Sequence, residues 1–505
     1  MSRGKIVIKN TIWEMGYYIV VIALGFFAPR YIILYYSSEV NGLSSTIQHI
    51  INILLMLQAG ATTAAIYSLY QPIAENNYEA ICSNIISAQN FFKKISFVFG
   101  GLMIVTALVI PFIIETNLDL IFVFLAMIIM GAKSFIDLYF TARFRIIFTA
   151  YQQKFYISIA TLVEQVMYYL LVFFTVFMRW HYIWMYVWLL LGCVSKIICL
   201  EYMLRISHPE FLVIKGNGNR SKIEGRNYAL VNEVAHSVMG SSVTIMMSFM
   251  YGLAEASVYS VYALVSDALN LISVSLYSAF APSFGSLYAQ GDKERSLKVF
   301  LTFQYIFVMF STFLMMCMLF AVVPFVKIYT KGATDIDYIN YALATVMAVS
   351  GVFSAYRVPY NIIVSSCGFF KETWVQPAIT LVICLGMAYE FGSVEYTYIL
   401  IGSTVFFAVN FIYQHFKLKK IISYMISHNV FIMFAISAVG ILATIFINTR
   451  FLFPDGIFAW FGCLMIYAVL VIIYLIVTSL LLCRKTFKAA IEYLCSIVKK
   501  KNSRT

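Results

Sequence analysis

Residues 457–482 read IFAWFGCLMIYAVLVIIYLIVTSLLL, an apolar run that contains no charged side chain. The hydrocarbon core of a bilayer is about 30 Å thick, and about 20 apolar residues in a helix are enough to cross it. The run therefore predicts a membrane-spanning helix. Similar runs recur along nearly all of the 505 residues. They are continuous rather than alternating, which argues against the strands of a membrane barrel.

The composition agrees with this interpretation. Hydrophobic residues make up 62% of the chain and charged residues only 11%, whereas about a quarter of a soluble domain is charged. A soluble enzyme, a nucleic-acid-binding protein and a disordered scaffold are therefore excluded. The 9 cysteines form no C-x-x-C pair and fall mostly inside apolar runs, where a thiol behaves as a small hydrophobe. We expect no disulfide framework, no metal site and no cofactor.

Apolar windows separated by polar breaks predict an all-α polytopic membrane protein with about fourteen transmembrane helices. The polar stretch 75–94, after the second span, predicts an amphipathic surface helix. The predicted spans run approximately over 11–36, 42–70, 95–114, 118–142, 154–178, 183–205, 229–251, 258–285, 297–323, 339–366, 375–391, 396–416, 430–448 and 457–482.

The distribution of cations predicts the orientation of these spans. Most of the 35 lysines and arginines fall in loops that the predicted spans place on the same side of the membrane as the N-terminus. The opposite segments carry only Arg179, Lys327, Lys331 and Arg450. Cytoplasmic loops are the ones enriched in lysine and arginine, so both termini are predicted to be cytoplasmic and the number of spans even. The net charge of +12 is thus a topology signal and gives no reason to expect nucleic acid as a partner.

An internal repeat divides the chain. The tripeptide SLY ends the second predicted span at 68–70 and the eighth at 286–288, and an acidic polar stretch follows each copy. When the two copies are aligned, His49 corresponds to Asp267. A repeat of six spans is a plan that many secondary transporters use. The predicted parts are an N-terminal lobe (1–206), a cytoplasmic linker (207–228), a C-terminal lobe (229–428) and two further spans with a basic tail (429–505).

Ionisable side chains at bilayer depth are costly unless they are paired or hydrated, so each one is a candidate for function. Arg30 follows Pro29, which frees a backbone carbonyl, and its own span offers no nearby anion. Arg357 lies beside Pro359. We predict both arginines to be cavity residues. The full set is Arg30, His49, Lys133, Asp137, Glu164, Lys196, Glu233, His236, Asp267 and Arg357.

Structural roles are the alternative for several of these residues. Lys133 and Asp137 lie four residues apart, where they can neutralise each other on one helix face. Lys196 is close enough to the cytoplasmic end for its stem to snorkel. Glu233 and His236 lie near cytoplasmic ends, where interfacial roles are favoured. The sequence leaves both alternatives open.

A family likeness is carried by several stretches, namely GFFAPRYII (25–33) with EVNGL (39–43), SLYQPIAEN (68–76), GLAEASVYS (252–260), AQGDKE (289–294) and YRVP (356–359). They resemble the bacterial polysaccharide flippase family, the Wzx-like branch of the multidrug/oligosaccharidyl-lipid/polysaccharide exporter superfamily. The resemblance covers roughly residues 10 to 420. In one departure, relatives often carry a Thr-Asp-Asn-like element in the seventh span, where this chain has SVT at 242–244. Asp267 is a candidate replacement for that acid.

The resemblance implies two six-helix lobes in a V around a central cavity, with two extra C-terminal helices. It implies a flippase that moves polyprenyl-diphosphate-linked oligosaccharide from the inner to the outer leaflet by alternating access, for capsule, O-antigen or exopolysaccharide assembly. A diphosphate headgroup cannot cross hydrocarbon unaided, and guanidinium groups bind phosphate bidentately. We predict substrate binding by Arg30, Arg357, Lys196 and Lys133. Coupling to H⁺ or Na⁺ is predicted at Asp267, Glu164, His49 or Asp137.

The resemblance also implies a monomer in the bacterial cytoplasmic (inner) membrane, with membrane lipids, a polysaccharide polymerase and other assembly proteins as partners. One alternative is a multidrug exporter of the same superfamily, coupled to an H⁺ or Na⁺ gradient. That alternative gains if Glu164 and Asp267, rather than Arg30 and Arg357, line the cavity. The other alternative is a membrane enzyme such as a polymerase or ligase. Such enzymes need a large outer loop, and the outer loops here are short, so no enzymatic activity is expected.

Overall fold

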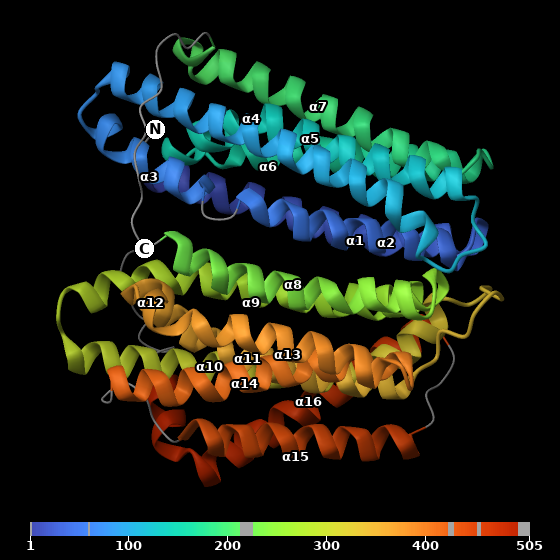
Figure 1. Cartoon of the computed structure of the whole chain (residues 1–505). Coiled ribbons are helices and arrows are strands. Elements are labelled where there is room, and N and C mark those ends of the chain that lie inside the picture. Colours follow the sequence, from blue (N-terminus) through green and yellow to red (C-terminus); the bar gives the residue numbers. More distant parts are fainter. Residues whose placement is uncertain (1–2, 59–60, 213–225, 423–428, 452–455, 493–505) are drawn as a thin grey trace. The chain divides into compact units, whose positions relative to one another are not determined.

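A computed structural model describes residues 3–58, 61–212, 226–422, 429–451 and 456–492 (Figure 1). Every regular element within these ranges is helical. The prediction of an all-α polytopic protein is therefore confirmed. The described chain divides into two compact units, residues 1–260 with 332–336, and residues 261–331 with 337–505.

The first unit contains α1 to α8 and the first turns of α9. Its helices pack in series, with α1 along α6, α6 along α7, α7 along α5 and α5 along α4, while α2 packs against α8. The bounds are α1 Arg3–Tyr35, α2 Ser38–Leu55, α3 Ala61–Ala74, α4 Tyr78–Val109, α5 Leu120–Ala150, α6 Phe155–Phe177, α7 Ile183–Ser207, α8 Arg226–Met250 and α9 Leu253–Ala289.

The second unit contains the rest of α9 and all later helices. In it α10 packs against α11, α15 and α16, and α14 packs against α11 and α13. The bounds are α10 Lys293–Tyr329, α11 Tyr341–Cys367, α12 Phe370–Thr373, α13 Val375–Gly392, α14 Ile399–Ile421, α15 Asn429–Arg450 and α16 Ile457–Leu482. Short 3₁₀ turns lie at Met56–Gln58, Ile110–Phe112, Pro209–Phe211 and Tyr396–Tyr398.

Thirteen segments of the described chain are long and apolar enough to cross a membrane. The sequence predicted about fourteen spans, and α8 accounts for the difference. It occupies the position of the seventh predicted span and is 25 residues long. However, it carries asparagine, glutamate, histidine and several serines, which lower its hydropathy below that of the other long helices.

Two sequence predictions about the first unit are wrong in detail. The predicted second span, 42–70, is not one helix, because α2 ends at Leu55 and α3 begins at Ala61. The predicted surface helix over 75–94 is not separate either. It is the first part of α4, which continues without interruption through the third predicted span, since no proline occurs between Tyr78 and Val109 to end it. Most of the linker predicted at 207–228 lies outside the described residues.

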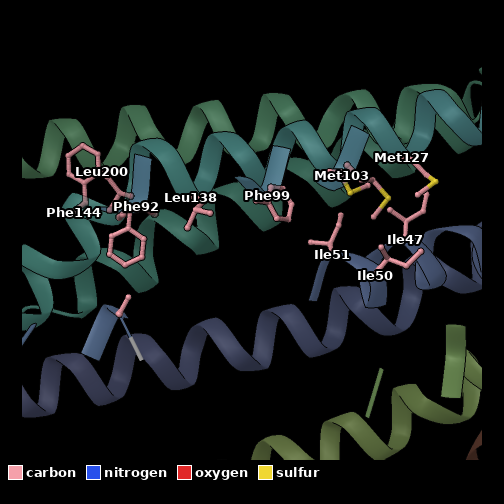
Figure 2. Packing of buried hydrophobic residues seen from close by; sticks show 14 of the residues in the cluster. Ile47, Ile50, Ile51, Phe92, Phe99, Met103, Met127, Leu138, Phe144 and Leu200 are labelled. Atoms are coloured by element: carbon pink, nitrogen blue, oxygen red, sulfur yellow. The ribbon is translucent and has the colours of Figure 1, made fainter. Parts of the chain in front are cut away.

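Buried apolar side chains fill the space between α2, α4, α5 and α7 in the first unit (Figure 2). Phe92, Phe99 and Met103 of α4 face Met127 and other residues of α5, and the remaining labelled side chains come from α2, α5 and α7. Small residues permit the closest approaches, as is usual for helices packed within a bilayer. At Gly131 of α5 an added Cβ would clash with the Met103 side chain of α4, so α4 and α5 pack closely at this point.

Candidate functional site

Four predicted site residues meet in one buried ion-pair network on α5, α6 and α7 in the first unit. Glu164 lies between two lysines, with its Oε1 3.1 Å from Lys133 Nζ and its Oε2 3.1 Å from Lys196 Nζ. Lys196 Nζ also donates a hydrogen bond of 2.6 Å to Asp137 Oδ1. Asp137 Oδ2 is 3.5 Å from an Arg145 guanidinium nitrogen. The charges thus alternate along a chain of five side chains.

The partners in this network differ from those that the sequence spacing favoured. Lys133 and Asp137 do not pair with each other on α5, because Lys133 pairs with Glu164 on α6 and Asp137 pairs with Lys196 on α7 and with Arg145. Lys196 does not snorkel, since its side chain is 8% exposed and held by two carboxylates. A buried charge requires such partners, and here they join three helices. The substrate-binding and coupling roles of these four residues stay predictions.

Arg30 presents a different environment. It lies half-buried on α1 directly after Pro29, and no hydrogen bond or ion pair involving it is found within the described ranges. On the same stretch of α1, apolar and aromatic side chains of α1 and α6 form a groove of about 440 Å³, whose lining does not include Arg30. We call it the α1–α6 groove; its residues are Phe27, Tyr31, Tyr35, Phe173, Val176 and Phe177.

Arg357 lies on α11 in the second unit and also has no carboxylate partner in the part of the chain that the structure describes. Its Nε is buried and lacks a hydrogen-bond partner. The guanidinium carbon lies 5.6 Å from the centre of the Phe407 ring on α14, so the contact that stabilises the charge is with an aromatic face. Both deep arginines therefore keep free hydrogen-bond donors.

The two residues related by the sequence repeat lie in separate units. His49, on α2 in the first unit, has a buried Nδ1 without a hydrogen-bond partner. Asp267, on α9 in the second unit, is exposed. It shares a hydrogen bond with the side chain of Asn270. Their predicted roles in ion coupling are not decided by these contacts.

A polar junction between α2 and α9 lies inside the first unit and is not among the sites predicted from the sequence. Asn41 of α2 is buried, and its Nδ2 donates hydrogen bonds of 2.8 Å to Ser257 Oγ and 2.9 Å to Ser260 Oγ on α9. At Gly42, an added Cβ would stand 1.8 Å from the carbonyl oxygen of Leu253. The stretches 39–43 and 252–260 are therefore packing partners. Small polar residues within apolar helices were the available signal.

Glu39 and Ser38 hold the start of α2. The Glu39 carboxylate accepts hydrogen bonds from the Thr116 hydroxyl at 2.6 Å and from the Asn117 backbone and side-chain nitrogens at 2.9 and 2.6 Å. Ser38 donates through its backbone nitrogen and its hydroxyl to Asp335 at 2.7 and 2.8 Å. The Asp335 carboxylate thus satisfies one free N–H group at the start of α2, and the Glu39 carboxylate ties that start to the segment before α5. No group of three or more potential metal ligands is found among the described residues.

Comparisons with solved structures identify the fold. One similar structure is a lipid II flippase, MurJ, in an inward closed conformation, with a TM-score of 0.66, 15% identity, and coverage of 95% of this chain and 100% of that one. Another is an inward-facing multidrug resistance transporter of the MATE family, with a TM-score of 0.58, 12% identity, and coverage of 81% and 98%. A third is a MOP superfamily transporter from Pyrococcus furiosus Vc1, described as having a binding pocket of reverse polarity. It has a TM-score of 0.56 and 11% identity, and the match covers 82% of this chain and 96% of that one.

The chain thus has the fold of transporters of the MOP superfamily, the superfamily to which the sequence resemblance pointed. A comparison with protein-family models gave no match, and a comparison with curated proteins gave none either. The thirteen candidate spans of the described residues and this fold support a multi-pass membrane protein. These structural neighbours are transporters and flippases rather than enzymes.

Proposed function

We propose that this protein is a flippase that moves polyprenyl-diphosphate-linked oligosaccharide from the inner to the outer leaflet of a bacterial cytoplasmic membrane, by alternating access, for surface polysaccharide assembly. One observation supports the proposal above others. Arg30 and Arg357 lie in apolar helices without a carboxylate partner among the described residues, while Lys133 and Lys196 are both neutralised. An uncompensated cation at this depth is costly, and a mobile anionic ligand would relieve that cost.

The chemistry of the two arginines suits a diphosphate. A guanidinium group offers paired N–H donors in a plane, which match two oxygens of one phosphate. On α1, Phe27, Tyr31 and Tyr35 recur at four-residue spacing and share one face. Arg30 lies three residues after Phe27 and so borders that face. A lipid tail lying in the α1–α6 groove would place its phosphate within reach of Arg30.

A specific observation favours a second candidate, a multidrug exporter. Asp267 is exposed on α9 and has no lysine or arginine partner in the described ranges, as a carboxylate that attracts a cationic drug would be. Glu164, the other acid on which this candidate depends, is 4% exposed and bound by two lysines. Of the acids that a drug exporter would use, only Asp267 is therefore free of an ion pair among the described residues, whereas both arginines assigned to the flippase function are.

The test uses the full chain in proteoliposomes that contain a fluorescent polyprenyl-diphosphate oligosaccharide. Translocation is measured as the fraction of headgroup that a membrane-impermeant quencher reaches over time. We expect Arg30→Ala to reduce the rate by about tenfold or more, because hydrogen bonds to charged groups are worth about 1.5–3 kcal/mol. Arg30→Lys should keep part of the rate. Arg295→Ala is the matched control, since Arg295 is exposed in the first turn of α10.

Two outcomes would contradict the proposal. Full translocation by Arg30→Ala removes Arg30 from the mechanism. Absence of translocation by the native chain, together with efflux of a cationic dye that Asp267→Asn abolishes, favours the drug exporter. In cells, deletion of the protein should trap a glycan-diphosphate lipid in the inner leaflet, which lipid extraction and mass spectrometry detect.

A further inference from the structure

A small cavity in the first unit lies between the break that separates α2 from α3 and the second half of α5. The space open to the centre of a water molecule in it is about 10 Å³, and about 10–15 Å³ by this measure holds one water. We call it the α3–α5 cavity. Its lining comes from the 3₁₀ turn after α2 and from α3, α4 and α5, and includes Gln58, Thr62, Phe92, Asp137, Leu138 and Arg145.

Gln58 contributes an acceptor that has no partner. Its side-chain Oε1 is buried and forms no hydrogen bond with the described residues. Leaving a buried acceptor unpaired costs about 1–3 kcal/mol, and buried waters commonly pair such groups. Thr62, at the start of α3, also lines the cavity and carries a hydroxyl group. Polar residues from both sides of the α2–α3 break therefore line this cavity.

The polar lining on α5 is the end of the ion-pair network. Asp137 Oδ1 accepts the hydrogen bond of 2.6 Å from Lys196, and Asp137 Oδ2 faces Arg145. That second contact is 3.5 Å long, whereas charge-assisted N–H···O bonds are usually about 2.7–2.9 Å. A guanidinium group has several N–H donors. Asp137 Oδ2 can therefore accept a further, shorter hydrogen bond, and Arg145 can donate one.

The size and the charge of the lining together select water as the ligand. The cavity is too small for a larger molecule. Asp137 already has two cations beside it, Lys196 and Arg145, which would repel a metal ion. A small anion would face the oxygens of Gln58 and Asp137. Water donates two hydrogen bonds and accepts two, so it can serve two oxygen acceptors and a guanidinium donor at once.

We propose that the α3–α5 cavity binds one water molecule, which donates to Gln58 Oε1 and Asp137 Oδ2 and accepts from Arg145. Three hydrogen bonds is about the usual number for a buried water. The bound water extends the ion-pair network of α5, α6 and α7 to the α2–α3 break. It also explains why a glutamine stands within the predicted span 42–70. The site does not depend on which substrate the protein transports.

The experiment is hydroxyl-radical footprinting of the purified full chain in lipid nanodiscs, with radicals made by a short X-ray pulse. The pulse splits water in place, so a buried side chain is oxidised where a bound water lies beside it. Phe92 and Leu138 line the cavity and are 2% and 5% exposed. Phe99, two turns further along α4, is 1% exposed and lies outside the lining (Figure 2). We expect oxidation of Phe92 and Leu138 in the native chain and none of Phe99.

Gln58→Leu tests the assignment, because leucine has a similar size but offers the water no acceptor. Oxidation of Phe92 and Leu138 should fall to the level of Phe99. The matched control is Gln48→Leu, the same change at an exposed position of α2, which should leave the oxidation pattern unchanged. A pulse given directly after dilution into water labelled with heavy oxygen identifies the source of the oxygen. A bound water exchanges slowly, so the first products should carry ordinary oxygen.

Each outcome decides the proposal. Oxidation of Phe92 no greater than that of Phe99 in the native chain overturns it, as does unchanged oxidation in Gln58→Leu. Immediate uptake of heavy oxygen would mean that bulk solvent reaches the cavity, and also overturns it. Loss of oxidation in Gln48→Leu as well would indicate a general change in the first unit and has the same consequence. If Gln58→Leu does not fold, the native comparison of Phe92 with Phe99 and the oxygen isotope still decide.

Discussion

Lys196→Met tests the ion-pair network of the first unit, because it removes the cation that two carboxylates share. Lys196 Nζ lies 2.6 Å from Asp137 and 3.1 Å from Glu164, and its side chain is 8% exposed. Methionine keeps a similar length and apolar stem, so the change removes mainly the charge. Removing one partner of a buried ion pair costs about 3–5 kcal/mol, because the other charge is left buried.

The remaining cations of the network should keep the cost of Lys196→Met near the lower end of this range of about 3–5 kcal/mol. Each carboxylate keeps one further cation, since Glu164 Oε1 is 3.1 Å from Lys133 and Asp137 Oδ2 is 3.5 Å from Arg145. We therefore expect the free energy of unfolding to fall by about 3 kcal/mol. Glu164→Gln should lower the free energy of unfolding less in the Lys196→Met variant than in the native chain, because Glu164 has already lost its partner Lys196 there. Coupling between such neighbours is about 0.5–3 kcal/mol.

The assay is an unfolding titration of the purified chain in mixed micelles, followed by tryptophan fluorescence and arranged as a double-mutant cycle. Arg205→Gln is the matched control. Arg205 is 65% exposed and 3.9 Å from Glu201, and an exposed pair contributes about 0–1 kcal/mol. If Lys196→Met is no more destabilising than Arg205→Gln, or if the two network substitutions are additive, the view of the network as a single buried structural unit is wrong.

Two further predictions concern packing and transport. Gly42→Ala should lower the melting temperature strongly or prevent folding, because the added Cβ would clash with the Leu253 carbonyl. The control is Gly101→Ala, where no atom lies within 4 Å of the added Cβ. It should leave the melting temperature unchanged in the same assay. Asp267→Asn should blunt the dependence of translocation on pH or sodium, since the exposed carboxylate can no longer exchange a proton or attract a cation. Flux measured against imposed gradients checks this, and unchanged gradient dependence would exclude Asp267 as the coupling group.

Most of the helices were predictable from the sequence because hydrocarbon imposes long apolar runs with polar breaks. The prediction of 457–482 matches α16 at both ends. The errors fall where that rule is weak. No proline or charge marks the end of α2 at Leu55, and the polar side chains of α8 lower the hydropathy by which a span is recognised.

The ion-pair partners could not be predicted, for a different reason. Spacing along one helix shows only which residues share a face, and on that basis Lys133 and Asp137 are predicted partners. Their actual partners are set by how α5, α6 and α7 pack, which a single sequence does not display. Likewise, the stretch 39–43 carries a family likeness in the sequence, but the close approach of Gly42 to Leu253 that explains its glycine depends on tertiary packing.

The docking of α15 and α16 on α10 has a consequence for how this region tolerates substitution. Asn448 and Trp460 donate to carbonyl oxygens of α10 and not to its side chains. Every amino acid supplies such an acceptor, so residues 319 and 321 can change identity while the anchoring bonds persist. Because Leu319 and Ala321 are buried, the apolar packing around them, and not the anchoring bonds, limits substitution there, whereas replacement of either donor would loosen the last two helices.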